Sequence, residues 1–304
     1  MSSTKEPFLP CPVCNASAIS FLIHGKDFSL TGDLFDIIQC EKCSLKFTHA
    51  IPDKDHIAPY YNFPDYISHT DIKEGWMNQL YHKVRRHTLQ HKTNWVQSLF
   101  TGHKGTLLEV GAGTGAFADS MIHKGWSVTA LEPDAASRQK ALDNYSIKLL
   151  HIESLDQLPH NSFDVITLWH VLEHVHDLKI YIASFKKLLK QNGRLIIAVP
   201  NYTSYDAQFY KEYWAAYDVP RHLYHFSPKS MDYLMRSFGL KIANLKPMWF
   251  DSFYVSLLSE KYKKSGFIGM IRALLIGLIS NLKAYRDHKK ASSIIYEIKK
   301  VNED

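Results

Sequence analysis

Cysteine is scarce in this chain of 304 residues, and none of it lies beyond residue 43. Long apolar runs are also missing: no basic start leads into an apolar N-terminal stretch, and no run of eighteen apolar residues occurs. A secretory signal and a transmembrane segment are therefore not expected. We expect a cytoplasmic protein, whose few cysteines serve as thiols rather than as disulfides.

A strong excess of one charge is absent as well. The sequence has 36 Lys and Arg against 30 Asp and Glu, and residues 255–304 contribute most of the difference. No arginine-rich run occurs, and Lys42 and Lys46 near the cysteines are balanced by Asp36 and Glu41. Nucleic acid is therefore the less favoured partner, and a small-molecule substrate is preferred.

The four cysteines form two CxxC pairs that are separated by 25 residues. Each pair directs two thiolates toward one point, and two pairs complete a tetrahedral shell. This spacing predicts a zinc ribbon over residues 1–50, with a structural Zn²⁺ that folds the module and takes no part in catalysis. Two disulfides are the alternative, which the expected compartment disfavours. The predicted ligands are Cys11, Cys14, Cys40 and Cys43.

Residues 51–100 contain three prolines and then apolar residues at helical spacing. We interpret this stretch as a helical connector. Its many histidines and tyrosines are expected to be packing and surface residues. The alternative is that Tyr66, Tyr81 or Arg85 faces the active site.

Beyond residue 100, short apolar stretches alternate regularly with helical ones. This alternation predicts a doubly wound, mostly parallel α/β sheet over residues 101–304, with a helical insertion at about 250–290. An antiparallel hairpin is expected to end the fold. The expected strands are 106–110, 127–131, 147–151, 163–168, 194–199, 240–247 and 293–299.

The first of these strands runs into "LLEVGAGTGAFADSM", where Gly111, Gly113 and Gly115 occupy every second position. Ligands of doubly wound sheets bind at the carboxyl ends of the strands. No lysine and hydroxyl residue follow the last glycine, which excludes a nucleoside triphosphate loop. A dinucleotide remains an alternative, because Glu132 stands 21 residues after Gly111 at the end of the second strand.

Glu109 before the glycines and three later segments resemble the class I S-adenosylmethionine-dependent methyltransferases. The segments are "LEPD", "FDVITLWHVLEHV" and "LKQNGRLIIAVPN", and they follow that family's order within residues 105–245. The resemblance implies a seven-stranded, Rossmann-like sheet and S-adenosylmethionine as the cofactor. A zinc ribbon before such a domain also resembles a bacterial subgroup that acts on sugars and other small metabolites.

The resemblance also implies which residues bind the cofactor. Glu132 would accept the ribose hydroxyls, Glu109 would reach the amino end, and bare glycines let the backbone approach the methionyl part. Ser154 and Leu155 stand where the family contacts the adenine. The expected set is Glu109, Gly111, Ala112, Gly113, Thr114, Gly115, Glu132, Pro133, Ser154, Leu155, Trp169 and His170.

Methyl transfer needs an aligned acceptor and, where the acceptor carries a proton, a base. Candidates lie in "WHVLEHV" and in "YWAAYDVPRHLYHFSPKSM". We expect Asp218 to orient His222 as the best base candidate, and Arg221 to grip an anionic group of the substrate. For each residue the alternative is a structural role. The catalytic candidates are His170, His174, Asp218, Arg221 and His222.

The sequence thus predicts a methyltransferase acting on a small molecule, on an oxygen of a saccharide or a related metabolite. An RNA-modifying enzyme docked by its zinc ribbon is the alternative, followed by a noncatalytic binding protein. The apolar segment "GFIGMIRALLIGLI" is expected to be too short and interrupted to span a bilayer. We expect it to be a core or homodimer element; a peripheral membrane contact, or a lid over a lipid-linked substrate, is the alternative.

Overall fold

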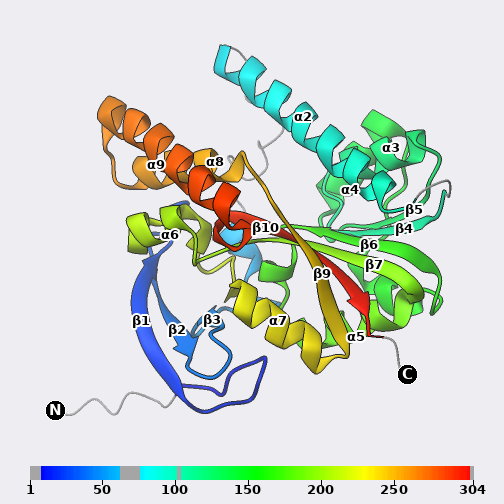
Figure 1. Cartoon of the computed structure of the whole chain (residues 1–304), viewed down its shortest axis with the longest axis horizontal. Coiled ribbons are helices and arrows are strands. Elements are labelled where there is room, and N and C mark those ends of the chain that lie inside the picture. Colours follow the sequence, from blue (N-terminus) through cyan, green and yellow to red (C-terminus); the bar gives the residue numbers. More distant parts are fainter. Residues whose placement is uncertain (1–7, 62–75, 101–103, 302–304) are drawn as a thin grey trace.

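The computed structural model describes residues 8–61, 76–100 and 104–301, with the backbone alone for residues 76–85. Within these residues the framework consists of two sheets (Figure 1). The larger sheet has the strand order β5-β4-β6-β7-β10-β9, and the smaller one has the order β1-β2-β3-β8. Helices cover both faces of the larger sheet, as expected for a doubly wound fold.

The larger sheet is parallel except for β10, which runs antiparallel between β7 and β9. The central strands are apolar along almost their whole length, because helices cover both of their faces. The antiparallel pairing of β9 with β10 confirms the expected terminal hairpin. The strands are β4 (Thr106–Val110), β5 (Ser127–Leu131), β6 (Phe163–Trp169), β7 (Leu189–Pro200), β9 (Leu240–Pro247) and β10 (Ser293–Lys300).

The prediction of seven strands was wrong, because the described sheet has six. The segment 147–151 meets the sheet edge only through Leu150, in an isolated parallel bridge to Leu131. The chain then turns at once into the 3-10 helix η2 (Ile152–Gln157), so no ladder extends along β5. A short apolar stretch at a sheet edge does not show from sequence alone how many residues will pair.

Apart from α2, which precedes β4, the helices beside the larger sheet form in the intervals between its strands along the sequence. The long helix α2 contacts α3, where Thr93 Oγ1 and Ser120 Oγ lie 3.1 Å apart. A serine cap opens α7, in which Ser227 and Ser230 form a reciprocal capping box. The helices are α2 (Trp76–Ser98), α3 (Ala116–His123), α4 (Ala135–Tyr145), α5 (Leu178–Leu188), α6 (Tyr205–Tyr210) and α7 (Pro228–Ser237).

The smaller sheet joins the N-terminal segment to the chain that follows β7. Its strands are β1 (Ile19–Lys26), β2 (Leu34–Cys40), β3 (Lys46–Thr48) and β8 (Tyr224–His225). Since β8 pairs with β3, residues almost two hundred positions apart complete one sheet. The buried cysteines and Leu45 also share an apolar core with Phe226 and with the helices below the larger sheet. The N-terminal segment therefore packs as part of the main body.

An ion-pair network is buried at the joint where the turn after β1 meets the loop between β7 and β8. The Arg221 guanidinium, 1% exposed, donates to Asp27 Oδ1 at 2.9 Å and to Asp218 Oδ1 at 2.6 Å. The same group donates to the Tyr60 carbonyl at 3.0 Å. Asp27 is wholly buried and also accepts the backbone amides of the turn that follows β1. The buried Asp27 carboxylate is thus paired with its cation only when the turn after β1 packs against the loop before β8.

The helical insertion forms a hairpin of α8 (Asp251–Tyr262) and α9 (Gly266–Arg286) that projects from the body in Figure 1. Small residues of α9 face α8, and a Cβ on Gly277 would lie 2.6 Å from the Phe253 ring. Of the described helices, α9 alone is long and apolar enough to cross a membrane. Our expectation that the segment is too short is wrong on length, because the helix continues to Arg286.

We predict that Arg221→Ala lowers the free energy of unfolding by about 3–5 kcal/mol, because it leaves the buried Asp27 carboxylate without its cation. Urea denaturation followed by circular dichroism measures this change. Arg236→Ala is the matched control: Arg236 also pairs with an aspartate, but it is exposed, and its loss should cost less than about 1 kcal/mol. Equal losses in the two variants would contradict the joint as we describe it.

Candidate active site

The glycine loop after β4 folds back over the carboxyl end of the sheet. The amides of Gly111 and Ala112 both donate to the Leu131 carbonyl, at 2.8 and 3.0 Å. Gly111 has φ +72°, and a Cβ there would lie 2.4 Å from Val171 Cγ2. The first glycine is therefore required, because the chain after β6 passes directly against it.

Gly113 has a different function, since it opens into space. A Cβ there would meet no described atom within 4 Å. Its amide donates to Glu132 Oε2 at 2.7 Å, and the amide of Asp134 donates to Oε1 at 3.0 Å. Each carboxylate oxygen keeps a lone pair, and burial raises the pKa of Glu132. The open loop beside this anchored carboxylate fits a ribose diol and the nucleoside of S-adenosylmethionine.

Glu109 lies beneath the same loop at 2% exposure, and its Oε2 has no hydrogen-bond partner among the described residues. Burial raises the pKa of Glu109 to about 8, and the charge of Lys92 acts in the opposite direction. The Lys92 ammonium lies 4.4 Å from the centre of the Trp169 ring. An unsatisfied carboxylate oxygen fits the cationic amino group of the cofactor. Sequence reasoning missed Lys92, because nothing in the pattern of α2 sets it apart.

His170 lies between two carboxylates just after β6. Its Nδ1 is 3.2 Å from Glu173 Oε1, and its Nε2 is 3.1 Å from Asp251 Oδ2 at the start of α8. Burial opposes the charge, but these two contacts raise the pKa of His170 to about 9. Both ring nitrogens thus face carboxylates, which favours the structural alternative for His170, and its catalytic role stays a prediction. Asp251 was not predicted, because it follows the last parallel strand by some fifty residues.

His174 and His222 meet at the same end of the sheet, with ring centroids 4.6 Å apart. His174 Nδ1 lies 3.0 Å from the Arg221 carbonyl, and His222 Nδ1 lies 2.8 Å from the Ala216 carbonyl. A carbonyl only accepts, so each Nδ1 carries a proton that it donates to its carbonyl. Burial and the neighbouring His222 lower the pKa of His174 to about 4, so His174 is neutral.

Two of the predicted catalytic roles are wrong. Arg221 cannot grip a substrate, because its guanidinium is buried against Asp27 and Asp218. Asp218 does not orient His222 as we expected, since the carbonyl of Ala216 does so instead. The two charged residues of this loop hold it in place, which is the structural alternative.

The other predicted cofactor residues lie around the glycine loop that follows β4. Leu155 is buried in η2 beside Ser154, directly after the bridge from Leu150 to β5. Trp169 contacts Phe117 edge to face. The roles of these residues and of Thr114 and Pro133 stay predictions. Tyr66 and the side chains of Tyr81 and Arg85 lie outside the described residues.

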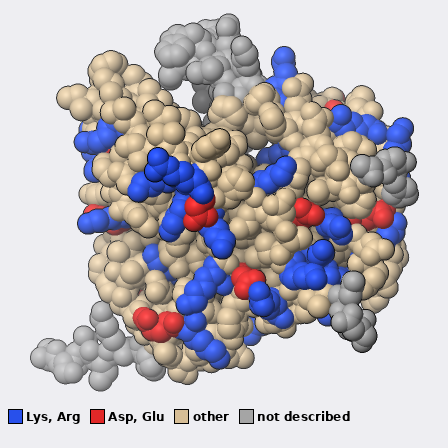
Figure 2. All heavy atoms as spheres, viewed as in Figure 1, with Lys and Arg blue, Asp and Glu red and all other residues tan. Residues whose placement is uncertain are grey.

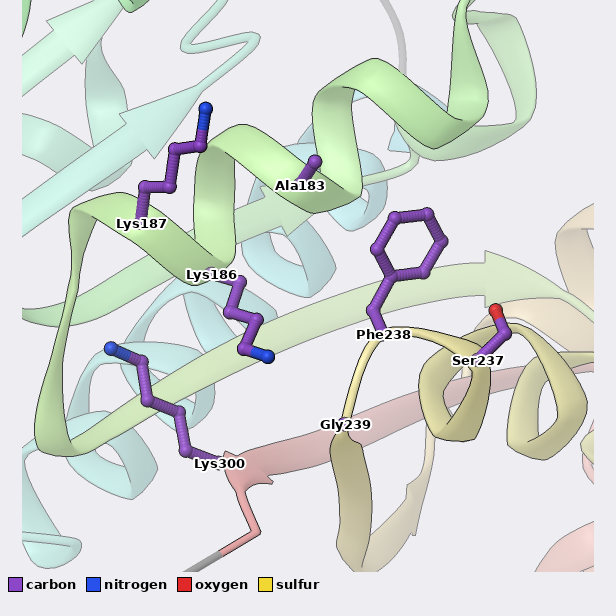
Figure 3. A pocket seen from close by; sticks show the side chains of 7 residues that line it. All are labelled: Ala183, Lys186, Lys187, Ser237, Phe238, Gly239 and Lys300. Carbon is purple, nitrogen blue, oxygen red and sulfur yellow. The ribbon is translucent and has the colours of Figure 1, made fainter. Parts of the chain in front are cut away.

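A surface groove at the other end of the sheet contains none of these residues. It lies between α5, the end of α7 and the last residue of β10, where Lys300 donates to the Leu189 carbonyl (Figure 3). Parallel strands begin at that end, whereas ligands of doubly wound sheets bind where the strands finish. Its lining residues are Ala183, Lys186, Lys187, Ser237, Phe238, Gly239 and Lys300.

The four cysteines converge as the CxxC spacing predicts. Their sulfur atoms all lie within 4.8 Å of one another, and the closest pairs, Cys11 with Cys43 and Cys14 with Cys40, are 3.5 and 3.4 Å apart. These separations are too long for disulfides and close to the ~3.8 Å between thiolates around a tetrahedral zinc. The cluster is compatible with zinc.

Comparison with known proteins agrees with the geometry. A family model described as a methyltransferase domain matches residues 81–245, which is more than half of the chain. The chain belongs to this methyltransferase family. S-adenosylmethionine is the cofactor of the family, and the open loop beside Glu132 and Glu109 fits it.

Among curated proteins, the methyltransferase is 34% identical over 112 residues to a mitochondrial ubiquinone biosynthesis O-methyltransferase of Schizosaccharomyces pombe, covering 34% of this chain and 39% of that protein. It is 32% identical over 147 residues to the ubiquinone biosynthesis O-methyltransferase of Photobacterium profundum, covering 46% and 60%. The chain thus spans less than two thirds of either relative.

Among solved structures, a phosphoethanolamine N-methyltransferase of Haemonchus contortus in complex with S-adenosyl-L-methionine aligns with a TM-score of 0.52 at 14% identity, covering 93% of this chain and 69% of that one. A 1,6-didemethyltoxoflavin-N1-methyltransferase of Burkholderia thailandensis aligns at 0.50 with 13% identity, covering 88% and 96%. These likenesses show the fold alone.

We predict that Gly113→Ala weakens the binding of S-adenosylmethionine at least tenfold, because the new methyl group enters the open space beside Glu132. Isothermal titration calorimetry measures the dissociation constant. Gly266→Ala is the control, since Gly266 also has a positive φ and an open surrounding but lies in the distant α8–α9 turn. Unchanged binding in Gly113→Ala would show that the cofactor lies elsewhere.

Proposed function

We propose that the methyltransferase transfers a methyl group from S-adenosylmethionine to an oxygen of a small molecule. The observation that carries this proposal is the pair of adjacent imidazoles of His174 and His222, each held through Nδ1 by a backbone carbonyl, at the same strand ends as the cofactor loop. A neutral imidazole is the side chain best suited to take the proton of a hydroxyl near pH 7. The named O-methyltransferase relatives support oxygen as the acceptor.

The bound cofactor would supply an electrophilic methyl group and leave as a neutral thioether. Glu132 and the backbone of Gly113 hold the nucleoside side of the site, and Glu109 holds the amino end. The acceptor oxygen would take the methyl group as the carbon–sulfur bond breaks, and the hydroxyl proton would pass to an imidazole of His174 or His222. His222 is the first base to test, because it lies on the loop that faces the strand ends. The side chains thus align the reactants and take one proton.

The more specific expectation of an anionic acceptor loses its main support, and the named relatives give none to a saccharide. The anion was to be held by Arg221, which is buried in its own ion pairs. The names of the relatives point toward quinone biosynthesis instead. The RNA alternative is not favoured either, because Lys46 of the N-terminal segment lies over the Tyr202 ring and burial lowers its pKa to about 8. We therefore propose an uncharged hydroxyl compound as the acceptor.

The zinc ribbon over residues 1–50 and the helical connector over residues 51–100 are part of the proposal. Zinc at the cysteines would join the turn before β1 to the turn between β2 and β3, and β3 would then present its edge to β8. Thr48 Oγ1 donates to the His222 carbonyl at 2.7 Å, so the ribbon reaches the base itself. His225 is buried against Thr48, which fits bracing rather than catalysis. A structural metal thus supports the catalytic loop.

We predict that His222→Ala lowers kcat at least 100-fold while the dissociation constant of S-adenosylmethionine stays unchanged, because only the proton transfer is lost. Labelled methyl groups are followed into a lysate that lacks the protein, fractionated into RNA, protein, lipid and polar metabolites. The exposed His160→Ala serves as control. Turnover within a few fold of wild type would remove His222 from the mechanism, and label that nuclease releases would favour the RNA alternative.

We further propose that the exposed face of α9 contacts a membrane surface from which an apolar substrate enters. The protruding hairpin is largely uncharged in Figure 2, and exposed lysines follow α8 at the turn. Ser280 anchors the helix by donating to the buried Asp206 at 2.6 Å, and Asp251 at the foot of α8 contacts His170. The hairpin therefore connects this face to the active site. Residues at least half exposed on α9 include Phe267, Ile268, Leu275 and Leu282.

We predict that the protein floats with vesicles that contain phosphatidylglycerol, and that Leu275→Glu lowers the bound fraction severalfold, because a charge on this face opposes burial. Leu142→Glu on α4 is the control, since Leu142 is similarly exposed elsewhere. Absence of flotation, with a dimer that Leu275→Glu converts to monomer, would contradict the membrane contact and make this face a homodimer interface.

A further inference from the structure

A second group of metal-ligating side chains lies near the cofactor loop, apart from the cysteines. Glu173 and His174 belong to the 3-10 turn η3 (Leu172–His174) after β6, and His222 lies on the loop that precedes β8. One donor atom from each lies within 4.8 Å of the others. Donors at this separation need to close only modestly to the ~3.4 Å found around a cation that binds at about 2.1 Å.

Each imidazole of the group has one ring nitrogen fixed by a backbone carbonyl. Both imidazoles direct Nδ1 at a backbone carbonyl, so Nε2 is the nitrogen of each ring that is left for a metal ion. This arrangement is typical of metal-binding histidines, in which the second nitrogen is held by an acceptor that fixes the tautomer.

Glu173 supplies the third donor and an independent sign of a missing partner. Its side chain is fully buried, Oε1 accepts from His170, and Oε2 has no hydrogen-bond partner among the described residues. A buried carboxylate oxygen without a partner is costly unless a cation satisfies it. His170 has a left-handed backbone conformation at φ +57°, and its contact with Oε1 orients this carboxylate. The unpartnered oxygen of Glu173 and the two imidazoles are thus suited to bind one cation.

We propose that Glu173, His174 and His222 bind a divalent transition-metal cation, Zn²⁺ or a close substitute, with a coordination position left open. Two imidazoles and one carboxylate suit such an ion, and a site with three protein ligands leaves room for an oxygen of water or substrate. The ion would be distinct from the closed shell of four cysteines. Its catalytic consequence rests on the proposed function, but the site itself does not.

A cation there changes how the acceptor is activated. A hydroxyl bound at the open position has its pKa lowered by the cation and loses its proton to water. The resulting oxygen anion attacks the methyl carbon as the carbon–sulfur bond breaks, so the charges of anion and sulfonium cancel. His222 then acts as a ligand, and it takes the proton itself only when no ion is bound. A substrate with two neighbouring oxygens would chelate the ion and be preferred.

The test counts zinc in the full-length protein after equilibration with buffered Zn²⁺ at about 1 µM. We expect two ions per chain in the wild type and in the exposed control His160→Ala, and one in Glu173→Gln and His222→Ala. For either variant the affinity of the second ion should fall at least 100-fold. Glu173→Gln keeps the shape of the side chain, and thermal unfolding shows whether each variant is folded.

One ion per chain in the wild type, or two in both variants, would overturn the site. The labelled-methyl assay on the same samples separates the two proposals. Two ions without methyl transfer would support the site and remove the proposed function, whereas methyl transfer with a single ion would keep the function and remove the site.

Discussion

The buried pairing of Arg221 with Asp27 and Asp218 is the interaction on which the active site depends. The guanidinium joins the N-terminal sheet to the loop after β7, and the carbonyl of the same residue accepts from His174. The buried Arg221 guanidinium must stay paired, and its pairing fixes the position of the Arg221 carbonyl. That carbonyl accepts from His174 and so keeps a proton on Nδ1 of the imidazole. The same loop presents the Ala216 carbonyl to His222. The loop before β8 therefore contributes both to stability and to the proposed chemistry, and the N-terminal segment holds it in place.

The methyl-transfer end of the site is built by elements outside the parallel sheet. The sheet provides the glycine loop, Glu109 and Glu132, as a doubly wound fold does at its strand ends. The helix before the sheet contributes Lys92, and the insertion between β9 and β10 contributes Asp251. These two side chains bring opposite charges to a buried site, next to Glu109 and His170 respectively. The family fold thus explains the cofactor, while the additions to it shape the acceptor side.

Sequence patterns predicted the sheet and the cofactor loop because both depend on local regularities. Strand period, glycine spacing and the paired CxxC each reflect one short stretch of backbone. The missing strand at 147–151 shows the limit, since pairing at an edge depends on where the chain turns next. Arg221 shows it more clearly. An arginine beside a histidine in a loop looks like a substrate clamp until the buried Asp27, almost two hundred residues earlier, is placed against it. Long-range partners of this kind have no local signature.

The central claim is that the open loop beside Glu132 binds S-adenosylmethionine rather than a dinucleotide. Calorimetric titration of the intact protein with S-adenosylmethionine, and then with NAD⁺, tests it most directly. The account predicts that one S-adenosylmethionine binds per chain. It also predicts that NAD⁺ gives no saturable heat of binding that S-adenosylmethionine abolishes. Saturable binding of NAD⁺, or the absence of any binding of S-adenosylmethionine to the folded protein, would contradict it.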